Sequence, residues 1–234
     1  MCLIGDSFLH GAMDSTTTTR HDNGILAPSV GPTFAYLNLA ADGDQSSAVT
    51  LSTHWSNRGR MLQYCTHVIW EYGNNDIDNS VTPATVLSNF ATLRAAWPNA
   101  TLYPNSPCCQ WWMTTLSPVV TTTDSLKTVA NQTPYNGSGT ARTTYNDGLR
   151  ASLPSGVAGY IEVAGTGTQA SPPNHKQTMS SLDSNAWTVY GDGVTANWMS
   201  GDALHLNTAG ANWMQGFINP RALFCTDAAS RRRC

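Results

Sequence analysis

Short apolar runs alternate along this chain with longer segments that have helical periodicity. Each run is brief and is followed by small polar residues, as is typical of buried parallel strands. The apolar runs lie at 2–4, 34–39, 67–70, 101–103 and 160–163. The helical segments lie at about 46–65, 82–97, 141–152 and 208–218. Because strands alternate with helices, the pattern predicts an α/β protein in which helices cover both faces of a parallel sheet.

Two regions do not follow this alternation and are predicted to be long loops. Residues 104–140 are rich in Thr, Ser, Pro and Asn and contain Trp111-Trp112. Residues 165–200 contain Pro172-Pro173 and several glycines. Long loops often form lids or binding edges. Two hypotheses for Trp111-Trp112 therefore stay open, a place in the core and a loop surface on which sugar rings stack.

Length and composition fit one domain. The 234 residues are 41% hydrophobic and include 8 Trp, enough for a sizeable core. No repeat or linker separates a second domain, so the domain is predicted to span 1–225, with a basic tail at 226–234.

Only 12% of residues are charged, with 12 Lys and Arg against 15 Asp and Glu. That balance excludes a general binder of nucleic acid or of anionic membranes.

The chain shows no segment that is expected to cross a membrane or to direct export. No apolar stretch approaches the ~20 residues that a membrane helix needs. The first four residues are too short for the core of a signal peptide, because Asp6 interrupts them. The chain is expected either not to use that export route or to begin after processing. Action outside the cell or at its surface stays open.

The six cysteines do not suggest a metal centre. None of them has the CxxC spacing of a zinc site, so we expect no metal and no cofactor. Cys2 and Cys65 are predicted to be ordinary core residues. A disulfide between Cys225 and Cys234, nine residues apart, stays open.

Polar residues that could perform nucleophilic catalysis follow the predicted strands. In a parallel α/β sheet, ligands bind outside the carboxyl ends of the strands, where Ser7 directly follows the first strand. A serine hydroxyl needs a base to take its proton, and the base needs an orienting carboxylate. His205 is the candidate base, and Asp202, three residues earlier, is its candidate partner. The alternatives are a turn serine that caps a helix and a surface histidine at a helix start.

An ester hydrolase also needs hydrogen-bond donors for the oxyanion. The candidate donors are the backbone N–H groups of Ser7 and Gly43 and the side-chain amide of Asn75. Gly59 also precedes the third strand, but Gly43 is favoured because it follows an apolar run closely. Asn75 could instead be a simple turn residue.

Four sequence blocks carry these candidates, in this order: Gly5-Asp6-Ser7-Phe8, Gly43 after Asn38-Leu39-Ala40, Gly73-Asn74-Asn75-Asp76, and Asp202-Ala203-Leu204-His205. In order and spread they resemble the blocks of the SGNH hydrolases, also called the GDSL esterase/lipase family, over about residues 1–220. The resemblance implies a flavodoxin-like, three-layer α/β/α sandwich with about five parallel strands. It also implies ester hydrolysis by a triad of Ser7, His205 and Asp202, with Ser7, Gly43 and Asn75 as the oxyanion hole.

Substrate class is inferred from composition and from residues near the predicted site. His10, three residues after Ser7, and Trp198, shortly before Asp202, are predicted to contact the substrate. Low charge, many Thr, Ser and Asn residues, and tryptophans in predicted loops favour short acyl esters, above all O-acetyl groups on a carbohydrate. Two alternatives stay open. One is a non-catalytic carbohydrate-binding or structural module on the same fold, and the other is an acyltransferase that uses Ser7.

Overall fold

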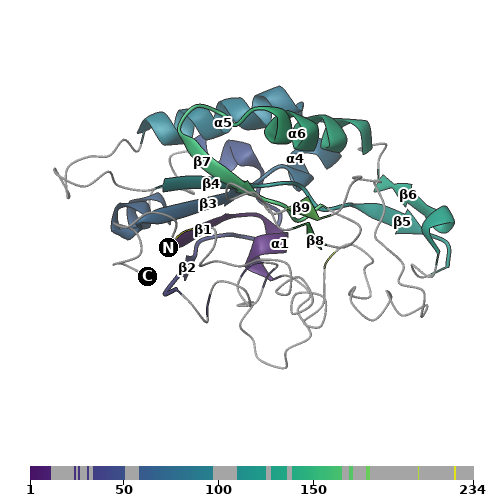
Figure 1. Ribbon diagram of the computed structural model, residues 1–234, viewed down its shortest axis with the longest axis horizontal. Helices are drawn as coiled ribbons and strands as arrows, with labels where there is room; N and C mark the ends of the chain where they lie inside the picture. The colour runs from purple at the N-terminus through teal and green to yellow at the C-terminus, as the bar shows by residue number, and fades with distance from the viewer. Residues whose placement is uncertain are drawn as a thin grey trace.

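A five-stranded parallel sheet forms the centre of the molecule (Figure 1). The computed structural model describes residues 1–11, 24, 26, 31, 34–50, 58–96, 110–124, 128–135, 139–164, 169–170, 178–179, 205 and 224. The strands are β1 (Cys2–Gly5), β2 (Leu37–Asn38), β3 (His67–Glu71), β4 (Gln110–Thr114) and β7 (Val157–Ile161). Their order, β2-β1-β3-β4-β7, is that of a flavodoxin-like sheet. The predicted α/β class and strand number are confirmed.

Helices lie on both sides of this sheet. The helices α4 (Asn74–Asp78), α5 (Pro83–Ala96) and α6 (Gly139–Ala151) lie over one face, and the single-turn α1 (Ser7–His10) lies on the other (Figure 1). The helices predicted at 82–97 and 141–152 correspond to α5 and α6. The helix predicted at 208–218 lies outside the described residues.

Each face of the sheet has its own hydrophobic core, because successive strand residues point to opposite faces. Ile4, Trp70 and Met113 pack on the side of α5 and α6. The neighbouring positions Leu3 and Ile69 pack on the side of α1, together with residues of α1 itself. The strands β1 and β3 are therefore buried on both faces, which explains why the sequence shows them as continuous apolar runs.

The fourth strand corrects the prediction of a long loop over 104–140. Trp111 and Trp112 lie in β4, 4% and 2% exposed, and belong to the cores on opposite faces of the sheet. Aromatic side chains favour strands. This preference and the burial of the two tryptophans outweighed the loop preference of the polar residues elsewhere in the segment 104–140. A short antiparallel hairpin of β5 (Val120–Thr122) and β6 (Gln132–Pro134) follows in the same segment. The strand predicted at 101–103 lies outside the described residues.

A second correction concerns the single helix predicted over 46–65. Its described parts include two 3₁₀ helices, η1 (Ser46–Thr50) and η2 (Met61–Tyr64). Serine and threonine side chains of η1 bond locally or to neighbours, as when Thr50 Oγ1 donates to the Ser47 carbonyl at 2.8 Å. Such bonds compete with a regular helix. The remaining short elements are η3 (Val129–Asn131), β8 (Gln169–Ala170) and β9 (Thr178–Met179).

A disulfide joins Cys2 and Cys65, which corrects their prediction as separate core residues. The bond links the start of β1 to the segment just before β3, across 63 residues, with the Cα atoms 5.7 Å apart. In the sheet, Cys2 lies opposite Val68, so the register brings Cys65 close to it. The sequence shows two isolated cysteines and does not reveal this register. Cys225 and Cys234 lie outside the described residues.

Among the helices that the structure describes, none has both the length and the apolar character that crossing a bilayer requires. The boundary between a domain at 1–225 and a tail at 226–234 stays a prediction, because the tail lies outside the described residues.

Candidate active site

The turn from β1 to α1 presents Ser7 at the carboxyl edge of the sheet. Asp6 caps the helix, since its carboxylate accepts the Phe8 N–H at 3.0 Å. Gly5 is required for space, because a Cβ there would lie 2.5 Å from Glu71 Oε2. Gly11, with φ 89°, ends the helix after one turn. The Gly-Asp-Ser sequence therefore holds the Ser7 hydroxyl at a defined place, with 7% of the residue exposed.

His205 meets Ser7 although 198 residues separate them. The imidazole Nε2 lies 2.7 Å from the Ser7 hydroxyl oxygen, within hydrogen-bond distance. The ring also packs against Phe8, with ring centroids 5.1 Å apart. A base within hydrogen-bond reach of a serine hydroxyl is the arrangement that nucleophilic catalysis needs. Asp202 and Trp198, the other predicted residues of this region, lie outside the described residues.

The two remaining candidate oxyanion donors lie next to each other at the same edge. Gly43 lies in the turn after β2 with φ 74°, a conformation that favours glycine. The Asn75 side chain, in α4, donates from Nδ2 to the carbonyl oxygen of Asp44 at 3.0 Å. An amide nitrogen carries two hydrogens, and within the described residues only one of them has a hydrogen-bond partner. Gly43 is exposed whereas Gly59 is buried, which favours Gly43 of the two candidates.

His10 links the nucleophile helix to the turn that carries Gly43. Its Nδ1 lies 2.7 Å from Asp42 Oδ1, and the two side chains are 30% and 49% exposed. The hydrogen-bonded pair is therefore partly open to solvent, at the last residue of α1. This position fits the predicted role of His10 at the substrate, and that role stays a prediction.

Two buried carboxyl groups, those of Asp6 and Glu71, lie next to the turn that carries Ser7. Asp6 belongs to the first sequence block, whereas Glu71 belongs to none of the four blocks. Glu71 is 1% exposed, and its Oε2 accepts the Asp6 N–H at 3.2 Å. The Asp6 carboxylate accepts N–H bonds from Phe8 and Asn75 and so joins the serine turn to α4. Glu71 directly follows three apolar residues, Val68 to Trp70. A charged residue at the end of an apolar run is the sequence feature that could have indicated a buried carboxyl here.

Burial changes the ionisation of both groups. Desolvation raises the pKa of Asp6 to about 7, although its hydrogen bonds act in the opposite direction. Desolvation, followed by the charge of Asp6, raises the pKa of Glu71 well above its usual value. The pair therefore holds a proton at neutral pH. Because Asp6 accepts the backbone N–H bonds, Glu71 is the better place for that proton.

This retained proton predicts that stability falls as pH rises. Between the ordinary aspartate pKa of 3.8 and the raised value of about 7, the folded chain binds more protons than the unfolded chain. The free energy of unfolding should then fall by about 1.4 kcal/mol per pH unit for each retained proton. Urea unfolding at several values between pH 4.5 and 7 measures this slope.

The matched variant is Glu71→Gln, which keeps a hydrogen-bond donor and removes the titrating group. Its unfolding free energy should depend less steeply on pH than that of the wild type. An identical slope in Glu71→Gln and the wild type would contradict the account.

A second carboxyl of α4 fixes the start of η1. Asp76 Oδ2 accepts the Ser46 N–H at 2.8 Å, and its Oδ1 accepts the Ser46 hydroxyl at 2.5 Å. Burial raises the pKa of Asp76. Asp76 thus braces the segment after Gly43 and does not face Ser7 as a base.

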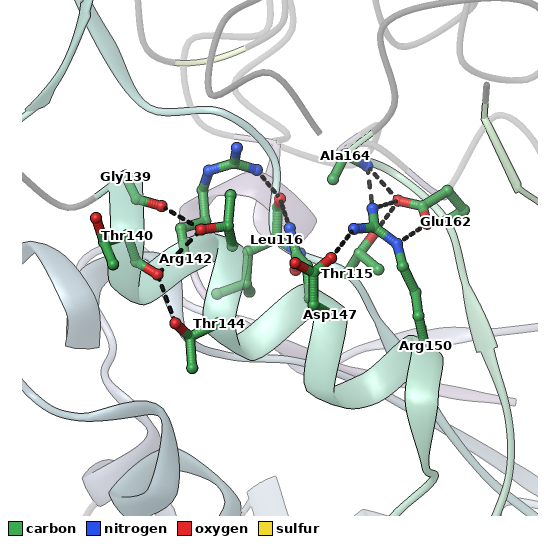
Figure 2. A network of polar contacts seen from close by, with 12 residues as sticks. Thr115, Leu116, Gly139, Thr140, Arg142, Thr144, Asp147, Arg150, Glu162 and Ala164 are labelled. Atoms are coloured by element: carbon green, nitrogen blue, oxygen red, sulfur yellow. Dashed lines mark hydrogen bonds and ion pairs between the residues drawn. The ribbon is translucent and has the colours of Figure 1, made fainter. Parts of the chain in front are cut away.

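Figure 2 shows a polar network that joins α6 to the segment after β4, which contains Leu116. Asn146 Oδ1 accepts the Leu116 N–H at 2.7 Å, and Arg142 Nη1 donates to the Leu116 carbonyl at 2.8 Å. Leu116 in turn fills the space beside Gly73, where a Cβ would come within 2.8 Å of it. The network therefore holds a leucine against the glycine that begins α4.

The same network includes a buried ion pair. Arg150 Nε and Nη2 donate to the two carboxylate oxygens of Glu162 at 2.9 and 3.0 Å. Thr115 Oγ1 donates to Glu162 at 2.6 Å, so α6 is tied to the ends of β4 and β7 (Figure 2). Because the Glu162 charge is paired and hydrogen-bonded, we assign it a structural role.

No group of three or more His, Cys, Asp or Glu residues that could hold a metal ion occurs within the described part of the chain.

Comparisons with known proteins agree on the fold. No protein-family model matches the chain, and no curated protein matches its sequence. Solved structures do match. One is a carbohydrate acetylesterase family member from Sinorhizobium meliloti, with 14% identity, a TM-score of 0.54, and coverage of 95% of this chain and 97% of that one.

Two further solved structures cover both chains to a similar extent. The lipase/acylhydrolase from Enterococcus faecalis has 14% identity, a TM-score of 0.51, and coverage of 95% and 94%. The lipase Lip_vut3 from a goat rumen metagenome has 10% identity, a TM-score of 0.56, and 95% coverage of each chain. The chain therefore shares the α/β fold of these three solved structures.

Proposed function

We propose that this chain is a serine ester hydrolase of the SGNH type. The observation that carries the proposal is the 2.7 Å contact between His205 Nε2 and the hydroxyl of the nearly buried Ser7. This contact lies at the carboxyl edge of a parallel sheet, beside Asn75 and Gly43. The similar solved structures, whose names include an acetylesterase, lipases and an acylhydrolase, support the same reaction class.

In the proposed reaction, Ser7 Oγ attacks the ester carbonyl while His205 Nε2 takes the hydroxyl proton. The oxyanion accepts hydrogen bonds from the Ser7 and Gly43 N–H groups and from the Asn75 amide. The C–O bond to the alcohol then breaks, and His205 gives its proton to the leaving alkoxide. Water, deprotonated by His205, then attacks the acyl-enzyme, the bond between the acyl carbon and Ser7 Oγ breaks to release the acid, and His205 returns the proton to Ser7 Oγ. Asp202 is proposed to hold the other ring nitrogen of His205.

We propose short acyl esters, above all O-acetyl groups, as the substrates. Trp111 and Trp112 no longer support a carbohydrate surface, because both lie in the core. The support that remains is the low charge of the chain and the acetylesterase name of one similar structure. Trp198 and His10 are proposed substrate contacts.

Hydrolysis of p-nitrophenyl acetate, butyrate and palmitate tests this proposal. We expect the highest kcat/KM on the acetate and the lowest on the palmitate. Binding of an acetylated glycan without cleavage of any ester would instead support a carbohydrate-binding module. Transfer of the acyl group to a sugar faster than to water would support an acyltransferase.

Asn75→Ala should lower kcat by about 10²–10³-fold, or about 2.7–4 kcal/mol, because it removes one oxyanion donor. Steady-state hydrolysis of p-nitrophenyl acetate measures the loss. Asn131→Ala, in the exposed hairpin region, is the matched control and should keep the wild-type rate. An Asn75→Ala variant as active as the wild type would remove Asn75 from the site.

The disulfide bears on where the protein acts. Disulfides form and persist in oxidising compartments and are rare in the cytosol. The Cys2–Cys65 bond therefore supports action outside the cell or at its surface.

A further inference from the structure

The segment that carries Gly43 is held at both ends by one arginine. Arg58 Nη1 donates to the Leu39 carbonyl at 3.1 Å, just before the turn. Arg58 Nη2 donates to Asp44 Oδ2 at 2.5 Å, just after it. The guanidinium therefore bridges the two ends of the four residues between Leu39 and Asp44, of which Gly43 is one.

Asp44 receives a second bond from the core of the sheet. Tyr72, fully buried, donates its hydroxyl to Asp44 Oδ2 at 3.3 Å. The side chains of Arg58 and Asp44 are only 23% and 20% exposed. A charge-assisted pair that is mostly screened from water and shares a buried partner holds its geometry better than a surface ion pair.

The same aspartate also orients the other oxyanion donor. The Asp44 carbonyl accepts the Asn75 Nδ2–H at 3.0 Å, which fixes the plane of that amide and leaves its second hydrogen for a ligand. Asp44 is thus covalently next to Gly43 and hydrogen-bonded to Asn75. Any displacement of Asp44 moves two of the three proposed donors together.

We infer that Arg58 is a positioning residue for the oxyanion hole, acting through Asp44 on Gly43 and Asn75. The inference rests on the proposed function, because it assigns a role in that same site. Arginine suits the task, since its planar fork reaches the Leu39 carbonyl and the Asp44 carboxylate at once. A lysine offers a single ammonium and cannot reproduce both contacts.

Arg58→Ala should lower kcat for p-nitrophenyl acetate by roughly 10–100-fold, which is less than the loss expected when an oxyanion donor is removed. The KM should change by less than about twofold. Asp44→Asn keeps the backbone carbonyl that accepts the Asn75 amide and removes the side-chain charge that pairs with Arg58. This variant should also have a lower kcat than the wild type. Arg58→Lys should fall between Arg58→Ala and the wild type. Arg60→Ala, at the exposed arginine two residues along, is the matched control and should keep wild-type kcat.

A double-variant cycle separates this role from general support of the fold. In the Asn75→Ala background, Arg58→Ala should lower kcat by a smaller factor than in the wild type, because one of the two donors that it positions is already missing. An equal fold-loss of kcat on Arg58→Ala in the wild-type and Asn75→Ala chains would overturn the inference about Arg58 but not the proposed function. A wild-type kcat in both Arg58→Ala and Asp44→Asn would do the same. Absence of ester hydrolysis by the wild-type chain would overturn the proposed function and this inference with it. Thermal unfolding of each variant shows that the compared chains are folded.

Discussion

Replacement of Ser7 by alanine is expected to lower kcat for ester hydrolysis by roughly 10⁵–10⁶-fold. The alanine has no hydroxyl to form the acyl-enzyme, whereas the oxyanion donors and the binding surface remain. His205→Ala should lose a similar factor, because the 2.7 Å contact makes the hydroxyl and the imidazole one functional unit. Steady-state hydrolysis of p-nitrophenyl acetate, corrected for the uncatalysed rate, measures both.

Groups that act as one unit do not add their effects. The double variant Ser7→Ala/His205→Ala should therefore be no slower than either single variant by more than a few-fold. Ser88→Ala, on the exposed face of α5, is the matched control and should keep full activity. Ester hydrolysis by Ser7→Ala at the wild-type rate would show that another group performs the chemistry.

Reduction of the Cys2–Cys65 disulfide should lower the free energy of unfolding by about 4 kcal/mol. The bond closes a loop of 63 residues and so restricts the unfolded chain strongly. Its two sulfurs join the first strand, which ends at the Ser7 turn, to the segment before β3. Urea unfolding of the oxidised wild type and of Cys2→Ala/Cys65→Ala measures the difference.

Mass spectrometry of a digest without reductant provides the direct control for this prediction. One linked peptide pair should contain Cys2 and Cys65, and it should separate when dithiothreitol is added. Free thiols at both residues in air-oxidised protein, or equal unfolding free energies for the two chains, would contradict the account.

Part of the fold was predictable because β1 and β3 are buried on both faces. The runs at 2–4 and 67–70 match β1 and β3 within one residue, and their polar followers place Ser7 and Asn75 at one edge. Parallel strands end at the same side of a sheet, so sequence order alone brings these groups together. The pairing of Ser7 with His205 was proposed from Asp202 and His205 standing together before a predicted helix, and the family resemblance implied it as well, although 198 residues separate the two.

What the sequence did not show depends on tertiary packing. Trp111 and Trp112 lie in a segment rich in polar residues, and they form a strand by pairing with β3 and β7, with their side chains in the cores on opposite faces. Cys2 and Cys65 become neighbours through the register of β1 and β3. Arg58 gains its role from two acceptors, Leu39 and Asp44, that no periodicity connects to it.

Labelling with a fluorophosphonate tests the central claim most directly. Ser7 Oγ should attack phosphorus and expel fluoride, which leaves one phosphonyl group per chain on the peptide that contains Ser7. Mass spectrometry of the digest locates the group, and the Ser7→Ala variant should take up none. A phosphonyl group on another residue, or ester hydrolysis that continues with Ser7 unlabelled after treatment, would contradict the assignment of Ser7 as the nucleophile.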